Sequence, residues 1–185
     1  MIAANEAAPL LEQARRILVI GCSGSGKSTL SQALAARLGS PYISMDREFF
    51  WLPGWTLRER GEVRRLIAEA VAGERWVMDG TSPGTLDLRL RRADMVIWLR
   101  MPRLLCIARV IRRRILYSGR SRPEMAPGCP EKIDREFLDY IWNFERTEMP
   151  EIRAALAQHG PDVPVVTLRS PAEVRDLLAR LDAAL

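Results

Sequence analysis

The sequence predicts an α/β protein with three layers, in which helices cover both faces of a five-stranded parallel sheet. Short apolar runs alternate with segments of helical periodicity along the chain, which is typical of parallel sheets. The apolar runs are rich in Val, Ile and Leu, as expected for strands that are buried on both faces. The length of 185 residues predicts a single domain that spans residues 1–185.

Five segments are predicted strands because each is apolar and is bounded by turn or capping residues. These predicted strands are residues 17–20, 41–45, 76–78, 95–99 and 163–168. The helices between them begin and end at recognisable signals: a capping box joins Thr56 to Glu59, and a second joins Ser170 to Glu173. The predicted helices cover residues 27–38, 56–72, 86–91, 102–115, 131–144, a segment from Pro150 to Gly160, and 171–181.

One connection is long and unusual in composition. Residues 118–130 are rich in Gly, Pro, Ser and Arg, which predicts a mobile loop. With the end of the preceding helix, it forms a lid-like segment at about residues 109–130.

Composition and charge exclude several classes of protein. Hydrophobic residues make up 48% and charged residues 28%, a balance that excludes a disordered chain or a fibrous repeat. The formal charge of +5 suits a polyanionic substrate or nucleic acid, and it also fits a simple codon preference for arginine. Three widely spaced cysteines, Cys22, Cys106 and Cys129, match neither a zinc site nor a disulfide framework and predict a cytoplasmic protein. The start of the chain lacks the layout of a signal peptide, and no apolar run is long enough to span a membrane.

The strongest motif is a phosphate-binding loop between the first strand and the first helix. It fits G-x-x-x-x-G-K-[ST], and its context of strand, loop and helix is the one that this motif requires. Glycines let backbone N–H groups point at phosphate oxygens, and the helix N-terminus adds a positive dipole. The residues predicted to bind the triphosphate of ATP are Gly21, Ser23, Gly24, Ser25, Gly26, Lys27, Ser28 and Thr29. Lys27 is predicted to reach the β- and γ-phosphates, and Ser28 to ligate Mg²⁺.

Two carboxylates follow predicted strands at the edge of the sheet where such a loop lies. Asp79 is the predicted partner of the metal ion, with an Asp-Gly turn as the alternative. Asp46 is predicted to be catalytic or to orient the acceptor, with a capping role as the alternative.

Arginines concentrate in the lid-like segment. Arg109, Arg112 and Arg113 share one side of a helix, and Arg120 and Arg122 lie in the loop that follows. Phosphoryl transfer needs neutralisation of negative charge, so Arg113, Arg120 and Arg122 are predicted catalytic residues. The alternative is a solvated basic face. The aromatic residues between positions 49 and 55 are predicted either to pack a helix against the sheet or to contact a ligand.

Several segments together resemble the DNA topology modulation protein family, which is itself similar to adenylate kinase and other P-loop kinases. They are ILVIGCSGSGKSTL, SMDREFFWLPGW, WVMDGTSPGTLDLRLRRADMVIWL, RVIRRRI and GRSRPEMAPGCPEKIDREFLDYIWNF, within residues 17–144. The resemblance implies the P-loop NTPase fold with strand order 2-3-1-4-5, ATP bound at residues 21–29 and a lid around residues 112–122.

One position departs from that pattern. Adenylate kinases usually have Asp-Gly-aromatic-Pro-Arg where this chain has Asp79, Gly80, Thr81, Ser82 and Pro83. The arginine that would hold an acceptor phosphate is missing there, although Arg58, Arg60 or Arg89 are candidates to replace it.

Two functional hypotheses follow. The first is a kinase that transfers the γ-phosphoryl group of Mg-ATP to a nucleotide or a small hydroxyl acceptor. The second is a nucleotide-dependent ATPase or regulator that associates with DNA or a protein partner, although no motif for reading DNA is evident.

Overall fold

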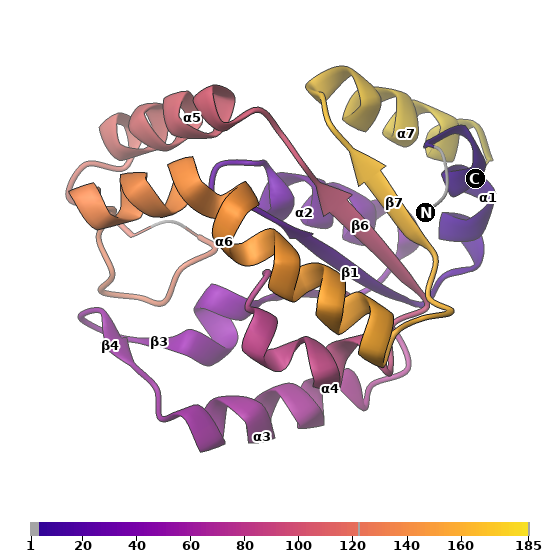
Figure 1. Ribbon diagram of the computed structural model, residues 1–185, viewed down its shortest axis with the longest axis horizontal. Helices are drawn as coiled ribbons and strands as arrows, with labels where there is room; N and C mark the ends of the chain where they lie inside the picture. Colours follow the sequence, from indigo (N-terminus) through magenta and orange to yellow (C-terminus); the bar gives the residue numbers. More distant parts are fainter. Residues whose placement is uncertain (1–3, 122, 185) are drawn as a thin grey trace.

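The computed structural model describes residues 4–121 and 123–184, and its centre is a five-stranded parallel sheet (Figure 1). The strands are β1 (Arg16–Gly21), β2 (Tyr42–Ser44), β5 (Trp76–Asp79), β6 (Met95–Leu99) and β7 (Val165–Leu168). They lie in the order β2-β5-β1-β6-β7, and every pair is parallel. Counted within this sheet, the order is second, third, first, fourth, fifth, which confirms the predicted order.

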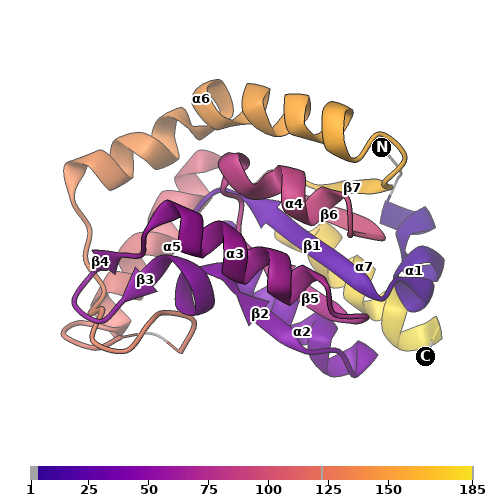
Figure 2. The same cartoon turned by 90° about the horizontal axis from the view of Figure 1, so that it is seen from below.

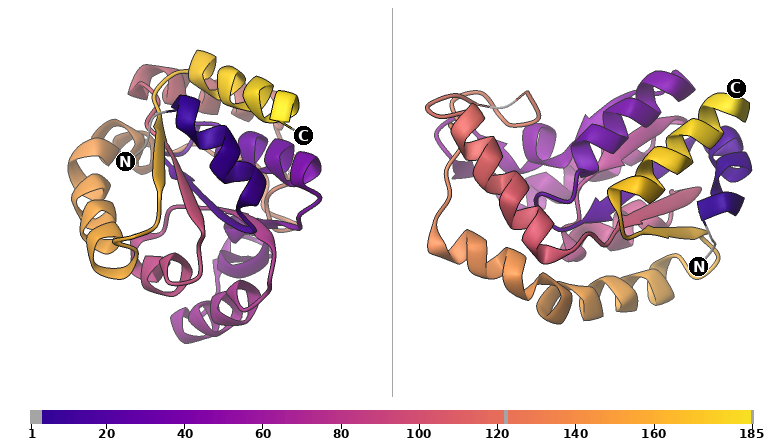
Figure 3. Two further views of the ribbon diagram at one scale, coloured as in Figure 1. Left: turned by 90° about the vertical axis from the view of Figure 1, so that its right-hand side faces the viewer. Right: turned by 90° about the horizontal axis from the view of Figure 1, so that it is seen from above.

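Helices cover both faces of the sheet, so the three-layer α/β fold is confirmed (Figures 2 and 3). One face carries α1 (Ala4–Gln13), α2 (Lys27–Leu38) and α7 (Pro171–Ala184). The other face carries α3 (Arg60–Val71), α4 (Leu86–Leu90) and α6 (Arg135–His159). The remaining helix, α5 (Arg103–Leu116), lies beyond the carboxyl end of the strands and packs against α6.

The core is built on the central strand. Ile17, Leu18, Val19 and Ile20 of β1 are fully buried because helices lie above and below them. Burying apolar side chains on both faces gives roughly 1.5–3 kcal/mol for each large residue and fixes the strand in place. The loop that follows β1 is therefore held at a fixed position at the carboxyl edge of the sheet.

The helix predicted from Thr56 begins four residues later. Thr56 instead belongs to a small hairpin of β3 (Trp51–Leu52) and β4 (Thr56–Leu57). Its turn needs positive φ at Gly54 (79°) and Trp55 (61°). The cap of α3 is Glu59, whose carboxylate accepts the backbone N–H of Glu62 at 2.9 Å. The prediction that Thr56 caps this helix is therefore wrong, because Thr56 pairs with Leu52 in the hairpin instead.

Two predicted helices, 131–144 and the one after Pro150, are a single helix. α6 runs from Arg135 to His159 with Pro150 inside it. A proline removes one backbone hydrogen bond, which lowers helix stability by about 3 kcal/mol in isolation. Packing along α4 and α5 holds α6 on both sides of the proline.

Three further elements were not expected from the sequence. α1 precedes the sheet and packs on α7. A single turn of π-helix, η1 (Asp46–Phe50), follows β2, so Asp46 begins a helical turn rather than ending a strand. A short 3₁₀ turn, η2 (Pro83–Thr85), leads into α4. Within residues 4–121 and 123–184, no helix is long and apolar enough to cross a membrane.

Candidate functional site: a phosphate loop and two carboxylates

The loop after β1 wraps closely because three of its residues have left-handed or related φ angles. Gly21, Gly24 and Gly26 have φ of 146°, 78° and 100°. A side chain on Gly24 would collide with the backbone carbonyl of Cys106 on α5, so only glycine fits there. The loop leads directly into α2, whose first turn has backbone N–H groups without intrahelical partners. The loop and the helix N-terminus together form a concave surface that is suited to an anion.

Lys27 is the first residue of α2, and its ammonium group lies over this loop. Its Nζ donates to the carbonyl oxygen of Cys22 at 2.9 Å. Burial lowers the pKa of Lys27, while the nearby carboxylates of Asp79 and Asp46 act in the opposite direction. The ammonium therefore lies close to both carboxylates that the sequence singled out.

Asp79 ends β5 beside the phosphate loop, because β5 pairs with β1. The Tyr42 hydroxyl donates to its carboxylate at 3.2 Å, and the side chain of Ser28 also forms a hydrogen bond with it. Burial raises the pKa of Asp79, since this residue is only 4% exposed. A buried carboxylate of this kind needs a cation to balance its charge.

The residues around Asp79 fit a magnesium ion. Mg²⁺ in nucleotide-binding sites is usually held by one or two protein oxygens together with phosphate oxygens and water. Ser28 and Asp79 supply two such oxygens beside the phosphate loop. Within the described part of the chain, no cluster of three or more metal-ligating side chains forms a closed site. The chemistry of these donors matches a metal that arrives with a nucleotide.

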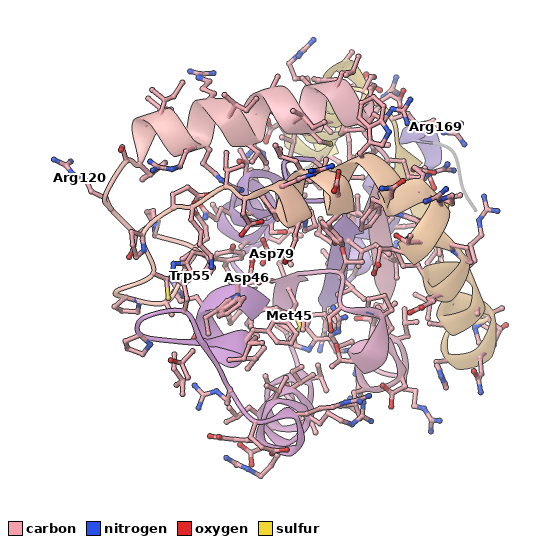
Figure 4. All side chains as sticks on the ribbon, turned by 60° about the vertical axis from the view of Figure 1, so that its left-hand side comes forward. Met45, Asp46, Trp55, Asp79, Arg120 and Arg169 are labelled. Carbon is pink, nitrogen blue, oxygen red and sulfur yellow. The ribbon has the colours of Figure 1, made fainter. Side chains whose placement is uncertain are left out.

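Asp46 lies near Asp79 at the same edge of the sheet, and both carboxylates face the same region (Figure 4). The two come from adjacent strand ends, since Asp46 follows β2 and β2 pairs with β5. Asp46 is exposed to solvent, whereas Asp79 is buried. The pair therefore differs in environment, with the buried carboxylate on the side of the phosphate loop.

A cavity of about 1040 Å³ connects these groups. Its walls include Lys27, Ser28, Asp46 and Asp79. One end reaches the start of α7, and the other reaches the hairpin and the start of α6. This volume is at the upper end of the range for small-molecule sites, enough for more than one ligand.

The predicted residues of the phosphate loop lie together. Gly21 itself does not line the cavity; it forms the base of the loop, where its N–H donates to Thr81 Oγ1 at 2.9 Å. The other predicted residues of the loop all line the cavity: Ser23, Gly24, Ser25, Gly26, Lys27, Ser28 and Thr29.

The three predicted catalytic arginines differ in where the structure places them. Arg113 lines the cavity, and its guanidinium forms an ion pair with the buried Glu131, with NH2 2.6 Å from Oε1. Arg120 is exposed and points away from Asp46 and Asp79, so the structure does not bring it to the cavity (Figure 4). Arg122 lies outside the described residues. Catalytic roles for these arginines remain predictions.

Three contributions to the site were missed by the sequence-based prediction. Arg109 donates to the carbonyl oxygen of Ser25 at 2.9 Å and so braces the phosphate loop from α5. Tyr42 holds Asp79, and Glu131 holds Arg113. The i, i+3, i+4 spacing of arginines on α5 was the only available signal for the first, whereas the other two depend on contacts between distant segments.

Arg89 was a candidate to bind an acceptor phosphate, and the structure contradicts this. Its side chain is fully buried and donates to the carbonyl oxygens of Thr85, Gly80, Thr81 and Ser82. Arg89 therefore holds the loop that follows Asp79.

The other two candidates do not line the cavity. Arg58 is engaged by the carbonyl oxygen of Phe49 and by Glu62, and Arg60 does not line the cavity.

A phosphate loop at the end of the first strand, with one carboxylate at the end of the adjacent strand β5 and a second just after β2, defines a protein of the P-loop kinase class. A family model described as an AAA domain matches residues 17–138, more than half of the chain, so the chain belongs to this family.

Two sequence relatives extend the comparison. The uncharacterized protein YqaC of Bacillus subtilis (strain 168) is 26% identical over 172 residues, which cover 90% of this chain and 95% of that protein. A shikimate kinase of Paramagnetospirillum magneticum (strain ATCC 700264 / AMB-1) is 29% identical over 143 residues, covering 68% of this chain and 70% of the kinase. The chain is thus similar over about two thirds of its length to a chain that is named as a kinase.

Solved structures of the same fold are also kinases. The shikimate kinase from Acinetobacter baumannii in complex with shikimate aligns with a TM-score of 0.59 and 16% identity, over 96% of both chains. A gluconokinase from Sinorhizobium meliloti 1021 aligns with a TM-score of 0.54 and 21% identity, over 92% of this chain and 93% of the gluconokinase. These matches establish the fold and leave the acceptor open.

Proposed function

We propose that this protein is an ATP-dependent kinase that transfers the γ-phosphoryl group of Mg-ATP to a hydroxyl group of a small molecule. The observation that carries the proposal is the meeting of Lys27, Asp79 and Asp46 in one cavity. Lys27 and the phosphate loop bind a triphosphate, and Asp79 supplies a metal ligand. Asp46 then lies on the far side of the transferred group, where an acceptor binds. The kinase name of the Paramagnetospirillum magneticum relative supports the same reaction class.

The two ends of the cavity have different chemistry, which supports a division between donor and acceptor. Towards α7 the wall is largely apolar, with Pro171, Val174 and Leu178. An apolar wall in the same cavity as the phosphate loop suits a nucleotide base. Towards the hairpin and α6, the wall contains carboxylates and aromatic rings, with Asp46 among the carboxylates. We assign the first end to ATP and the second to the acceptor.

In the proposed reaction, the acceptor oxygen forms a bond to the γ-phosphorus while the bond between this phosphorus and the bridging oxygen of ADP breaks. The hydroxyl proton passes to the carboxylate of Asp46. Bound Mg²⁺, held by Ser28 and Asp79, supplies positive charge to the phosphate oxygens. Lys27 and Arg112 supply positive charge from the protein.

A coupled assay of ADP formation tests the proposal with the full chain, Mg-ATP and a panel of small alcohols, sugars and nucleosides. The proposal predicts that at least one acceptor raises the rate of ADP formation at least tenfold over the rate with water alone. Asp46→Asn is expected to lose most of this stimulation, because the amide cannot accept the proton. A panel in which no acceptor raises the rate, or stimulation that survives in Asp46→Asn, would contradict the proposal.

A further inference from the structure

The acceptor end of the cavity is rich in negative charge. We define this end as the part of the wall contributed by η1, the hairpin, the loop that precedes α6 and the first turns of α6. Its carboxylates are Asp46, Glu124, Glu131, Asp134 and Glu136. Its described basic side chains are Arg113, from the facing helix, and Lys132. Among the described residues of this end, carboxylates therefore outnumber cations, in contrast to the end that contains the phosphate loop.

The two cations at this end are already engaged by the protein. Arg113 contacts the carboxylate of Glu131 with NH2 at 2.6 Å and Nε at 2.7 Å. Glu131 is 5% exposed, so separating the two would leave a buried carboxylate without this cation. The Lys132 ammonium lies 5.0 Å from the centre of the Trp55 ring, in the range of a cation–π contact.

Three arginines on the acceptor side of the sheet are likewise occupied. Arg58 and Arg89 are bound to carbonyl and carboxylate oxygens of the protein, as described above. Arg64 forms an ion pair with Asp87 at 2.6 Å. An anionic group that approached one of these three arginines would have to displace the contact that it makes.

A bound nucleotide makes the net charge of the cavity more negative. Among the residues that the structure describes, six basic and six acidic side chains line the cavity, so their formal charges balance without ligands. The basic ones are Lys27, Arg109, Arg112, Arg113, Lys132 and Arg175, and the acidic ones are Asp46, Asp79, Glu124, Glu131, Asp134 and Glu136. Mg-bound ATP is an anion, so the cavity with nucleotide has an excess of negative charge. A second anion would be repelled inside a partly dry site.

Aromatic rings complete the acceptor end. Trp51 and Trp55 meet edge to face with ring centroids 4.9 Å apart, and Phe137 and Tyr140 stack at 6.4 Å. All four line the cavity. Such a wall packs well against an apolar or planar face and also attracts positive charge.

From this charge balance and aromatic wall, and resting on the proposed kinase activity, we propose that the acceptor is an alcohol that carries no negative charge. It has an apolar or planar face for the aromatic wall, and its reacting hydroxyl group lies at Asp46. Phosphate monoesters and hydroxy acids are excluded as good acceptors. The preference is set by Glu124, Asp134 and Glu136 together with the closed Arg113–Glu131 pair.

Matched acceptors that differ by one anionic group test this inference with the full chain. The pairs are adenosine with AMP, glucose with gluconate, and glycerol with glycerol 3-phosphate. ADP formation gives the rate, and thermal stabilisation in the presence of Mg²⁺ and a non-hydrolysable ATP analogue gives binding. We expect the uncharged member of at least one pair to react at least tenfold faster and to add stabilisation. We expect no anionic member to exceed its partner.

A charge reversal at the acceptor end adds a second readout. Glu136→Lys places a cation on the exposed first turn of α6, and we expect it to reduce the preference for the uncharged member several-fold. Glu12→Lys is the matched control, because it makes the same change of charge on the exposed surface of α1 and should leave the preference unchanged.

The outcomes separate this inference from the proposed kinase activity. Faster reaction with an anionic member, or binding of anionic members alone, would overturn the inference and leave the kinase proposal standing. Nucleotide binding without binding or reaction of any uncharged alcohol would also overturn it. If the ATP analogue itself fails to stabilise the protein and no ADP forms with any acceptor, the kinase proposal falls.

Discussion

At the scale of single residues, the site depends on how the fold alters ionisable groups. Lys27 and Asp79 lie close to each other, and burial shifts the pKa of each towards its neutral form. Their mutual attraction opposes this shift in both cases. Each of these two groups of opposite charge can therefore bind a charged ligand. The lysine can bind a phosphate, and the carboxylate can bind a cation.

Removing the ammonium group should affect turnover far more than stability. Lys27→Ala is expected to lower kcat by roughly 10²–10³-fold, because the transferred phosphate loses a charged donor. Its effect on unfolding in urea should stay within about 1 kcal/mol, since the substitution removes chiefly the hydrogen bond from Nζ to Cys22. Arg65→Ala, on the exposed side of α3, is the control and should leave kcat unchanged. Full activity in Lys27→Ala would show that the site is misassigned.

Asp79 gives a prediction about pH. Burial raises its pKa above the value in the unfolded chain, so the folded protein binds this proton more tightly. The favourable contribution of the protonated form is lost as pH rises through the raised pKa. Asp79→Asn is neutral at every pH, so it should raise Tm at pH 7. The gain should shrink as pH falls towards the ordinary aspartate pKa of about 3.9.

Asp87 is the matched control with the opposite sign. A hydrogen bond from Arg64 lowers the pKa of Asp87, so its contribution to stability is present above the ordinary value and is lost at lower pH. Asp87→Asn should therefore lower Tm at pH 7, and its effect should fade on acidification. Identical pH profiles for the two variants in thermal melts would contradict these assignments.

At the scale of elements, the loop after β5 shows why the sequence predicted some contacts and missed others. The strand at residues 76–78 and the capping box at Ser170 carried local signals, and both are present in the structure: Glu173 N–H donates to Ser170 Oγ at 3.2 Å. Arg89 carried no such signal. Its partners are carbonyl oxygens of residues 80–85, which converge on it only when the chain has folded.

Arg89→Met should remove the donors that hold this loop. Several buried carbonyl oxygens would lose their partner, so we expect unfolding in urea to show a loss of at least about 2 kcal/mol. Arg91→Met is the neighbouring control, because Arg91 is exposed, and it should change stability by no more than about 0.5 kcal/mol. Equal effects from the two variants would mean that Arg89 does not organise the loop.

The same contrast explains the hairpin and α6. Periodicity and capping patterns describe one segment at a time, so they suggested a helix at Thr56 and a break at Pro150. Pairing of Leu52 with Thr56 and the packing of α6 along α4 are contacts between segments. They outweigh the local helix signal at Thr56 and the local break signal at Pro150. The order of the strands was predictable because it was taken from a resemblance that spans most of the chain.

At the scale of the whole molecule, residues 123–133, which precede α6, are docked over the acceptor end. Gly54 N–H donates to the carbonyl oxygen of Gly128 at 3.1 Å, and Trp55 Nε1 donates to that of Pro130 at 3.0 Å. Ser44 Oγ contacts the carbonyl oxygen of Glu124 at 2.9 Å. We propose that this segment is the lid of the kinase, with the Arg113–Glu131 pair as its link to α5.

Breaking that link should loosen the lid. Arg113→Ala leaves the buried Glu131 without this cation, so we expect hydrogen exchange in residues 123–133 to become several-fold faster in the absence of nucleotide. Arg114→Ala is the control, because Arg114 contacts Ser118 on the same helix end and not Glu131. Unchanged exchange in Arg113→Ala would show that the pair does not hold the lid.

The proposed kinase activity requires that the loop at residues 21–29 bind a triphosphate, and calorimetric titration with a non-hydrolysable ATP analogue measures this binding. We predict saturable binding of one nucleotide per chain in the presence of Mg²⁺, weakened at least tenfold in Lys27→Ala and unchanged in Arg65→Ala. No binding to the unaltered protein, or equal affinity in Lys27→Ala, would contradict the account.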